Sequence, residues 1–286
     1  MKHGTSLSLE PERVMIKAAL SLAICAGAAA ATAHDTWFRA LPGDRPGDAV
    51  LLLGTGNRFP VQEYAVGAEH LRRSGCRSGT LAGTLQPVQL MSKALLLRGA
   101  ALRPTGAPPA PLTCWAQLAP FDVELSPELV NVYLDDIAAP AAVRDAWAAM
   151  QSRGVRWKER FTKHARIEVG AAATPSAAAL PTPTDMGMDV LLESGVGIAR
   201  QGDLLSFRVL RDGRPLADFA VELRSEGEAA ASWLKTDAEG RVAWPPPAPG
   251  NWVLRGTDLR VSEASPDAWE SRFVTLAFAV AAPIGR

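Results

Sequence analysis

Short β-like runs separated by glycine and proline turns fill most of this sequence, and they limit the possible fold more than any other feature. Ala49–Leu53 is one such run, with Pro-Gly-Asp before it and Gly-Thr-Gly after it, and Leu85–Leu90 is another. Apolar or alternating runs bounded by turn residues are typical of strands. The region from Thr36 to Cys114 is therefore predicted to be rich in β-structure.

Two helices are predicted to interrupt this pattern. Ser126–Glu128 combines a capping hydroxyl, a proline for the first helical position and a carboxylate for the first turn. We expect one short helix to follow it and a second to cover Ala141–Ser152, with Gly154 as its C-terminal stop. The segment Trp157–Val169 is ambiguous, because its charged pattern could continue as helix and then pass into a strand over Ala165–Val169.

A linker separates two predicted domains. Residues 171–184 contain three prolines among small residues, a composition typical of an extended linker. Beyond it, residues 185–286 show at least five short strand-like runs at the spacing of a β-sandwich. We therefore predict a mainly β protein made of two immunoglobulin-like or prealbumin-like β-sandwich domains. The first covers 34–170 and contains the short helical insertion, and the second covers 185–286.

A leader of the secretory type precedes these domains. Lys17 stands before the apolar run Ala18–Ala30, and Ala31–Ala33 supplies the small residues of an A-x-A cleavage site. We expect residues 1–33 to be a signal peptide, so that the mature protein is periplasmic or secreted and begins with His34. The apolar run is shorter than the roughly 20 residues that span a bilayer, and no later run approaches that length, so we expect no membrane-spanning segment.

Charge and cysteine content narrow the possible partners. The full chain has a net charge of zero, and removal of three basic and two acidic leader residues leaves minus one. This balance does not favour nucleic acid as a partner. Cys76 and Cys114 remain after cleavage, and two cysteines in an oxidising compartment most often form a disulfide. A thiolate metal site is the alternative, although the two cysteines lack the paired spacing of such sites.

His34 is the main candidate for chemistry. As a first residue it would offer its α-amino group and its imidazole to one ion, a donor set that suits nickel, copper or zinc. His164 is a candidate third ligand, and Asp258 or Glu270 would complete the metal site. The alternative is that His34 is only the residue after the cut and His164 a surface histidine. Trp37 is a candidate wall of the site.

Seven segments, in this order along the chain, resemble a known family. They are residues 34–38, 130–134, 158–165, 212–217, 236–242, 249–254 and 269–271. Together the segments resemble a bacterial periplasmic family classed as a domain of unknown function, number 4198, whose members are often described as nickel-uptake components. The resemblance implies a secreted protein with a role in metal uptake. This sequence departs from the family near Asn57 and near Thr257, since members of the family often carry a histidine in each of these two places.

The sequence therefore leads to two hypotheses about function, neither of which is enzymatic. The sequence lacks Gly-x-Ser-x-Gly, His-Glu-x-x-His and phosphate-binding glycine loops, so we expect no enzymatic activity. The first hypothesis is a binding protein that delivers a transition metal, nickel-like by the resemblance, to a membrane transporter component of an uptake system. The second is a structural or interaction module of the cell envelope that binds a protein or a glycan.

Overall fold

The structure is a computed structural model that describes residues 34–42, 48–101, 111–170, 182–194, 199–228 and 231–283. The expected signal peptide over 1–33 and most of the expected linker, 171–181, lie outside these described residues. Among the helices that the structure describes, none is both long and apolar enough to cross a membrane.

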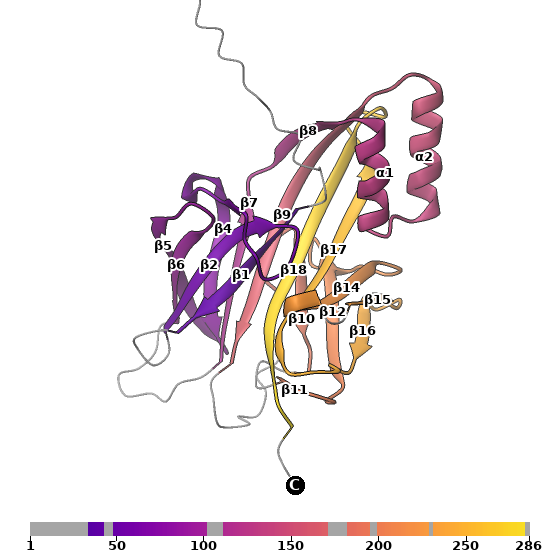
Figure 1. The fold of residues 1–286 in the computed structure, drawn as a ribbon. Helices are drawn as coiled ribbons and strands as arrows, with labels where there is room; N and C mark the ends of the chain where they lie inside the picture. The colour runs from indigo at the N-terminus through magenta and orange to yellow at the C-terminus, as the bar shows by residue number, and fades with distance from the viewer. Residues whose placement is uncertain are drawn as a thin grey trace, which may run out of the picture. The chain divides into compact units, whose positions relative to one another are not determined.

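One large sheet includes strands from both halves of the sequence. Its described part has fourteen strands, and Figure 1 shows its long central strands side by side. The order along the sheet is β1 (Asp35–Leu41), β2 (Asp48–Gly56), β6 (Leu95–Ala101), β5 (Leu81–Leu90), β4 (Leu71–Ser78), β7 (Leu112–Leu118), β9 (Trp157–Val169), β18 (Trp269–Ala281), β17 (Gly250–Val261), β14 (Ala220–Ser225) and β15 (Ala231–Lys235). Three short strands pair beside this path: β3 (Tyr64–Ala65) with β2, β8 (Phe121–Leu125) with β9, and β11 (Ala199–Arg200) with β18.

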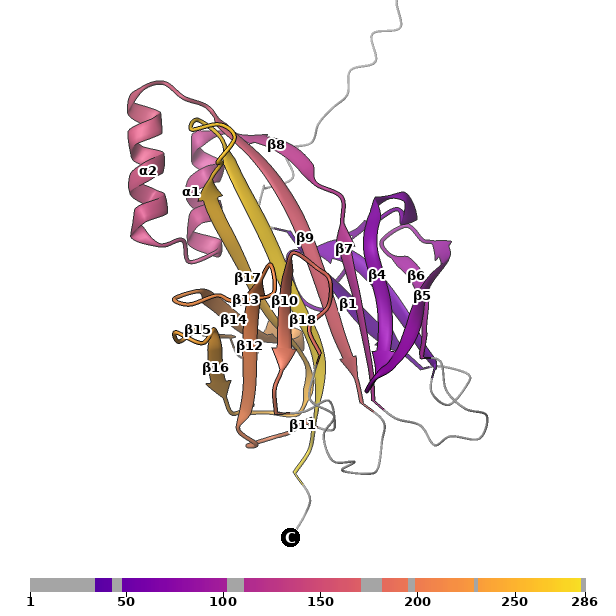
Figure 2. The same cartoon turned by 180° about the vertical axis from the view of Figure 1, so that it is seen from behind.

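A smaller sheet covers one face of the large one near its C-terminal strands. It contains β10 (Met188–Leu192), β12 (Leu205–Arg211), β13 (Arg214–Pro215) and β16 (Arg241–Trp244), and Figure 2 shows it in front of β18. Short 3₁₀ turns lie at Ala68–His70 and Glu226–Glu228. The prediction of a mainly β fold is confirmed, and the two sheets are consistent with a β-sandwich.

The parallel pair β9–β18 joins the two halves of the chain. It pairs Trp269 with Glu159 at one end and Ala277 with Ile167 at the other. Trp157–Val169 is strand along its whole length, because β8 and β7 pair with one edge and β18 with the other. The helix expected at the start of this segment is therefore wrong, and the strand expected over Ala165–Val169 is confirmed.

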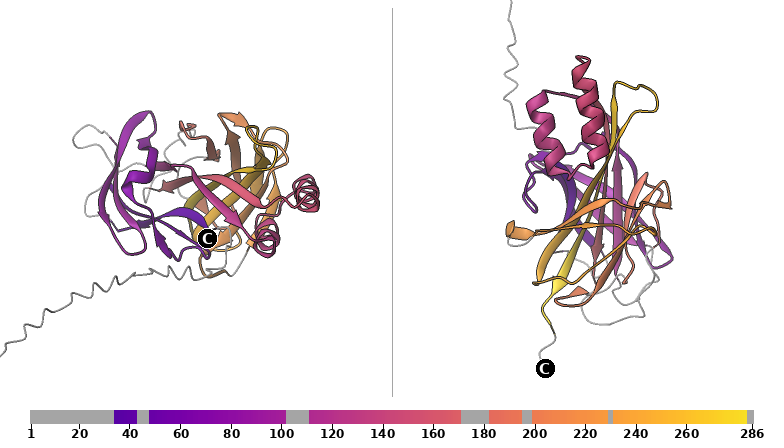
Figure 3. Two further views of the ribbon diagram at one scale, coloured as in Figure 1. Left: turned by 90° about the horizontal axis from the view of Figure 1, so that it is seen from above. Right: turned by 90° about the vertical axis from the view of Figure 1, so that its right-hand side faces the viewer.

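Both predicted helices form, as α1 (Pro127–Asp136) and α2 (Ala141–Ser152). The Ser126 side chain accepts the backbone N–H of Leu129 at 3.4 Å, and Pro127 takes the first helical position. Gly154 follows α2 with a φ of +75°, a value that favours glycine. The helices lie together at one end of the long strands (Figure 3) and pack on an aromatic cluster that includes Trp147, Trp157 and Trp269.

Side chains alternate between the two faces of β9 and β18, and this alternation decides what each can reach. Lys163 lies beside Phe273 and His164 beside Val274, so each pair projects from one face. The Val274 face packs against the smaller sheet, in a core that also contains Leu276. The opposite face carries Phe273 under the helices.

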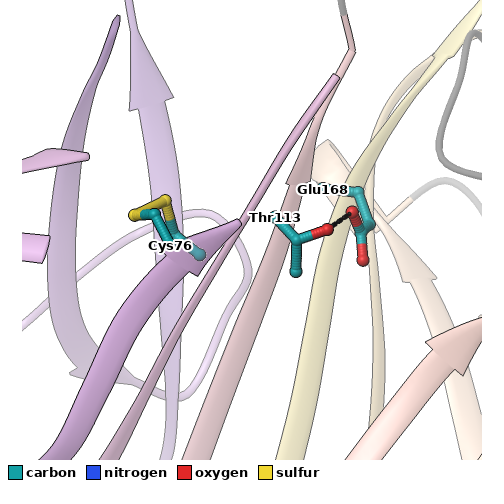
Figure 4. Close-up of a disulfide and its surroundings, with 4 residues drawn as sticks. Cys76, Thr113 and Glu168 are labelled. Atoms are coloured by element: carbon teal, nitrogen blue, oxygen red, sulfur yellow. Dashed lines mark hydrogen bonds between the residues drawn. A yellow bond between two sulfur atoms is a disulfide. The ribbon is translucent and has the colours of Figure 1, made fainter. Parts of the chain in front are cut away.

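The predicted disulfide joins Cys76 on β4 to Cys114 on β7, with Cα atoms 4.1 Å apart. The two residues lie directly opposite each other in the antiparallel pair. Gly99 on β6 provides the necessary space, since an added Cβ there would lie 2.6 Å from the Cys114 Sγ. Figure 4 shows this bridge beside Thr113 and Glu168, two polar residues of the neighbouring strands β7 and β9.

Candidate functional site

His34 lies immediately before β1 and is partly buried against the neighbouring strand β3. Its ring makes an edge contact with Tyr64 at 5.2 Å between centroids, and its Nε2 is 3.9 Å from the Glu63 Oε2. Burial lowers the pKa of His34, and the nearby charge of Lys163 acts in the same direction. A lowered pKa favours the neutral imidazole, which is the form that binds a metal ion.

Two side chains from the central strands hold the backbone of β1 at its start. Lys163 Nζ donates to the carbonyl oxygen of His34 at 2.7 Å, and Thr275 Oγ1 donates to that of Thr36 at 2.6 Å. Both carbonyls therefore point toward β9 and β18. This attachment fixes the position of residue 34 relative to the long strands.

The opposite edge of β1 pairs with β2. Glu63 N–H donates to the Thr55 carbonyl at 2.8 Å, so the backbone of Thr55 faces β3 and that of its neighbour Gly56 faces β1. Asp35 is the partner of Gly56 in the register. The Asp35 N–H is therefore directed at the Gly56 carbonyl.

Arg255 on β17 organises a buried group of charged residues next to His34. It donates to Asp35 at 2.8 Å, to the Asp136 carboxylate at 3.0 and 3.1 Å, and to Glu222. Burial raises the pKa of the Asp35 carboxyl, although the Arg255 charge acts in the opposite direction. With Lys163, these four residues are called the Arg255 cluster below. Its Asp136 side chain is 28% exposed, so the cluster reaches the surface.

Lys163 is the second cation of this cluster and is buried between apolar and acidic neighbours. Its Nζ lies over the rings of Phe161 and Phe273, at 5.4 and 5.8 Å from their centroids. Burial lowers the pKa of Lys163 to about 8, although the negative charges of Asp35 and Glu159 act to raise it. The Lys163 ammonium thus has carboxylates nearby, and it donates a hydrogen bond to the His34 carbonyl oxygen.

His164, a predicted ligand, projects from the other face of β9 and so points away from His34. It is 1% exposed, which corrects the alternative of a surface histidine. Its Nδ1 lies 2.9 Å from the Phe273 carbonyl oxygen, and burial lowers its pKa to about 4.

On that same face of β9 lies a second buried group of charges. Arg166 donates to Glu168 at 2.8 Å and to both oxygens of Asp189 at 3.1 Å. These three residues are called the Arg166 cluster below. The Thr113 hydroxyl bonds Glu168, and the Thr184 backbone N–H bonds Asp189, so the carboxylates are enclosed by donors.

Asp258 and Glu270, the remaining predicted ligands, have other partners. Asp258 is bonded by Arg211 and by Arg260, the latter at 2.9 Å. Glu270 is exposed, accepts the Ser262 hydroxyl at 2.7 Å, and lines a surface pocket of about 410 Å³. Neither contact involves His34 or His164.

The structure thus does not bring His34, His164, Asp258 and Glu270 into one group. Among the described residues, no three or more His, Cys, Asp or Glu side chains gather where they could hold a metal ion. The neighbours of His34 are instead Glu63, Tyr64 and Lys163. Sequence reasoning missed these residues, because no spacing pattern links positions 34, 63 and 163, which meet only through strand packing.

The family comparison covers this whole site. A family model described as a domain of unknown function, DUF4198, matches residues 31–257. The chain belongs to this family. The DUF4198 match includes His34, Glu63, Lys163 and Arg255 and ends within β17. Comparisons with curated proteins and with solved structures give no match. The family description carries no activity, so function has to be argued from the site itself.

Proposed function

We propose that the mature protein binds a divalent transition metal ion through His34. The proposal needs cleavage after Ala33, which would give residue 34 a free α-amino group beside its imidazole. The observation that carries it is the way residue 34 is held: Lys163 fixes its carbonyl at 2.7 Å, and its ring stands beside Glu63. A chelating residue held at the start of a strand is preorganised for its ion.

The chemistry of this donor set suits a few ions. Nickel, copper and zinc all accept amine and imidazole nitrogens as ligands. The carboxylate of Glu63 would not bind the ion itself but could orient the imidazole ring that does. His164, Asp258 and Glu270 have no part in the proposed site, because they bond Phe273, Arg260 and Ser262 instead. The biological role we propose is carriage of the ion in the periplasm or outside the cell, for transfer to a membrane component of an uptake system.

Calorimetry tests the proposal directly. Protein secreted with its native N-terminus, its mass verified, is titrated with Ni²⁺, Cu²⁺ and Zn²⁺. We expect one ion per chain, and we expect His34→Ala to abolish binding while His70→Ala, a change at a partly exposed histidine near Phe121, does not. Absence of binding by the untagged wild-type protein would exclude the proposal.

A second candidate function rests on a different region. At the end of β5, Val88, Leu90 and Met91 are 58%, 59% and 46% exposed, an unusual concentration of apolar surface at one hairpin. It supports an interaction module that binds an envelope protein or glycan. Binding of an envelope component that persists with chelator present and in His34→Ala, but is lost on Leu90→Lys, would favour this function over metal carriage.

A further inference from the structure

We infer that the ion bound at His34 is held by that residue's two nitrogens alone, without the backbone amide of Asp35, so that its remaining coordination positions are open to exchange. This inference rests on the proposed function and specifies how the same site works. It concerns the peptide group between His34 and Asp35, whose two ends are both occupied in the folded protein.

The backbone amide matters because free N-terminal peptides often use it. A metal ion anchored on an α-amine can displace the proton of a following peptide N–H and take the nitrogen as a ligand. Nickel and copper then adopt the square-planar geometry that nitrogen donors favour. To coordinate in this way, the amide must lose its proton and any hydrogen bond it makes.

In this fold the His34–Asp35 peptide is held from both sides. The carbonyl oxygen of His34 accepts the Lys163 ammonium at 2.7 Å. The Asp35 N–H is directed at the carbonyl of Gly56, its register partner in β2. Deprotonation of this amide would break the first backbone hydrogen bond of β1 and rotate the peptide away from Lys163.

Asp35 itself adds a further constraint on the same peptide. Its carboxylate is bonded to Arg255 at 2.8 Å, and the side chain is only 6% exposed. Rotation of the peptide would move this carboxylate away from its cation inside the protein. Leaving a buried charge without its partner is strongly unfavourable.

The two ring nitrogens of His34 have different possible roles in a chelate with the residue's own amine. Only Nδ1 can close a six-membered chelate ring with the α-amino group, because Nε2 lies one bond farther away. Nε2 faces the Glu63 Oε2 at 3.9 Å, and this oxygen also accepts the Asn57 N–H at 3.2 Å. Glu63 therefore lies on the Nε2 side of the ring, where it could accept the ring N–H and orient a metal-bound histidine after a small approach.

Two protein nitrogens leave most positions of a divalent ion to water or to donors from another molecule. The ion is then held in a form that a partner can capture by adding its own ligands. This coordination suits an exchangeable cargo ion rather than a permanently bound one.

The test compares the folded mature protein with a synthetic peptide of residues 34–38, His-Asp-Thr-Trp-Phe, which has the same donors and no β2 or Lys163. Each is given Ni²⁺ at mildly alkaline pH, and absorption and magnetic susceptibility are recorded. We expect a yellow, diamagnetic square-planar complex with the peptide and a paramagnetic complex of higher coordination number with the protein. Unfolding the protein in urea should convert its spectrum to that of the peptide.

Glu63→Gln supplies the second measurement. Loss of an outer carboxylate typically weakens metal affinity about tenfold to a hundredfold, and we expect a loss in that range. Glu69→Gln is the matched control, because the Glu69 side chain is 72% exposed and pairs with His70. An unchanged affinity in Glu63→Gln would remove the outer-carboxylate role.

The outcomes separate the two proposals. A square-planar, diamagnetic nickel complex in the folded protein would overturn this inference and leave metal binding at His34 intact. Failure of the folded protein to bind nickel, while the peptide binds it, would overturn the proposed function and this inference with it. A paramagnetic complex that disappears in His34→Ala would support both.

Discussion

The two faces of β9 carry two buried groups of charges that are closed to different degrees. In the Arg166 cluster the three side chains are 1%, 3% and 3% exposed, and every carboxylate has further donors around it. In the Arg255 cluster the exposed fraction rises to 28% at Asp136, and the cluster's second cation, Lys163, bonds the backbone of His34. Both groups are costly to bury, and the second is bonded to the backbone of His34.

This difference indicates separate roles for the two groups. The Arg166 cluster attaches β10 and the residues just before it to β9, through Asp189, Thr184 and Thr182. The Arg255 cluster attaches β1 and the end of α1 to β17. We therefore expect changes in the first to alter stability alone, and changes in the second to alter both stability and metal binding.

The largest expected effect follows from Arg166→Met. The substitution leaves Glu168 and Asp189 buried without their cation, a change that typically costs about 3–5 kcal/mol. Urea denaturation monitored by tryptophan fluorescence measures this loss. Nickel affinity per folded molecule should remain that of the wild type, and a large drop in it would contradict the division of roles between the two clusters.

Acid should destabilise the protein through His164. Its pKa is about 4 in the folded protein and 6.5 when unperturbed, so between these values the unfolded chain binds a proton that the folded chain does not. The contribution of His164 to stability therefore falls by about 3 kcal/mol as pH decreases from about 6.5 to about 4. Denaturation curves across this range should show the slope, and His164→Gln should reduce it; an unchanged slope in the variant would show that other groups cause it.

A smaller change in stability is expected for Lys163→Met, with a distinct effect on metal binding. Asp35 keeps Arg255, and Glu159 keeps hydrogen bonds from Tyr133 and Trp157 at 2.9 Å, so no carboxylate loses all its partners. Residue 34 loses the bond that holds its carbonyl. We expect nickel affinity to fall about tenfold, as for other supporting residues of metal sites.

Thr275→Val is the control for that experiment. It removes the bond to the Thr36 carbonyl at 2.6 Å but leaves the His34–Asp35 peptide untouched. Calorimetry should show nickel affinity close to that of the wild type. An equal loss in both variants would mean that general loosening of β1, rather than the hold on residue 34, controls binding.

The predictable parts of the fold were those with local signals. Ser126 as a capping residue and Gly154 as a stop marked helix ends, and runs such as Ala49–Leu53 marked strands through their apolar content. Trp157–Val169 was ambiguous because its charged residues resemble a helix surface. Its strand form depends on β7, β8 and β18, which pair with it from other parts of the sequence.

The candidate site was predictable only at His34. Proximity to Glu63 and Lys163 arises because β3 pairs with β2, and β1 crosses the face of β9 that carries Lys163. Neither of these two strand arrangements can be recognised from the spacing of residues in the sequence. The placement of His164 on the opposite face follows from strand alternation once Trp157–Val169 is known to be a strand.

Native mass spectrometry of the secreted protein, with and without Ni²⁺, tests the central claim most directly. A single measurement reports where the mature chain begins, whether the Cys76–Cys114 bridge has formed, and how many ions are bound. The account predicts a chain that begins at His34 and binds one nickel ion, and no bound ion in His34→Ala. A mature chain that begins elsewhere, or one that begins at His34 and binds no nickel, would contradict it.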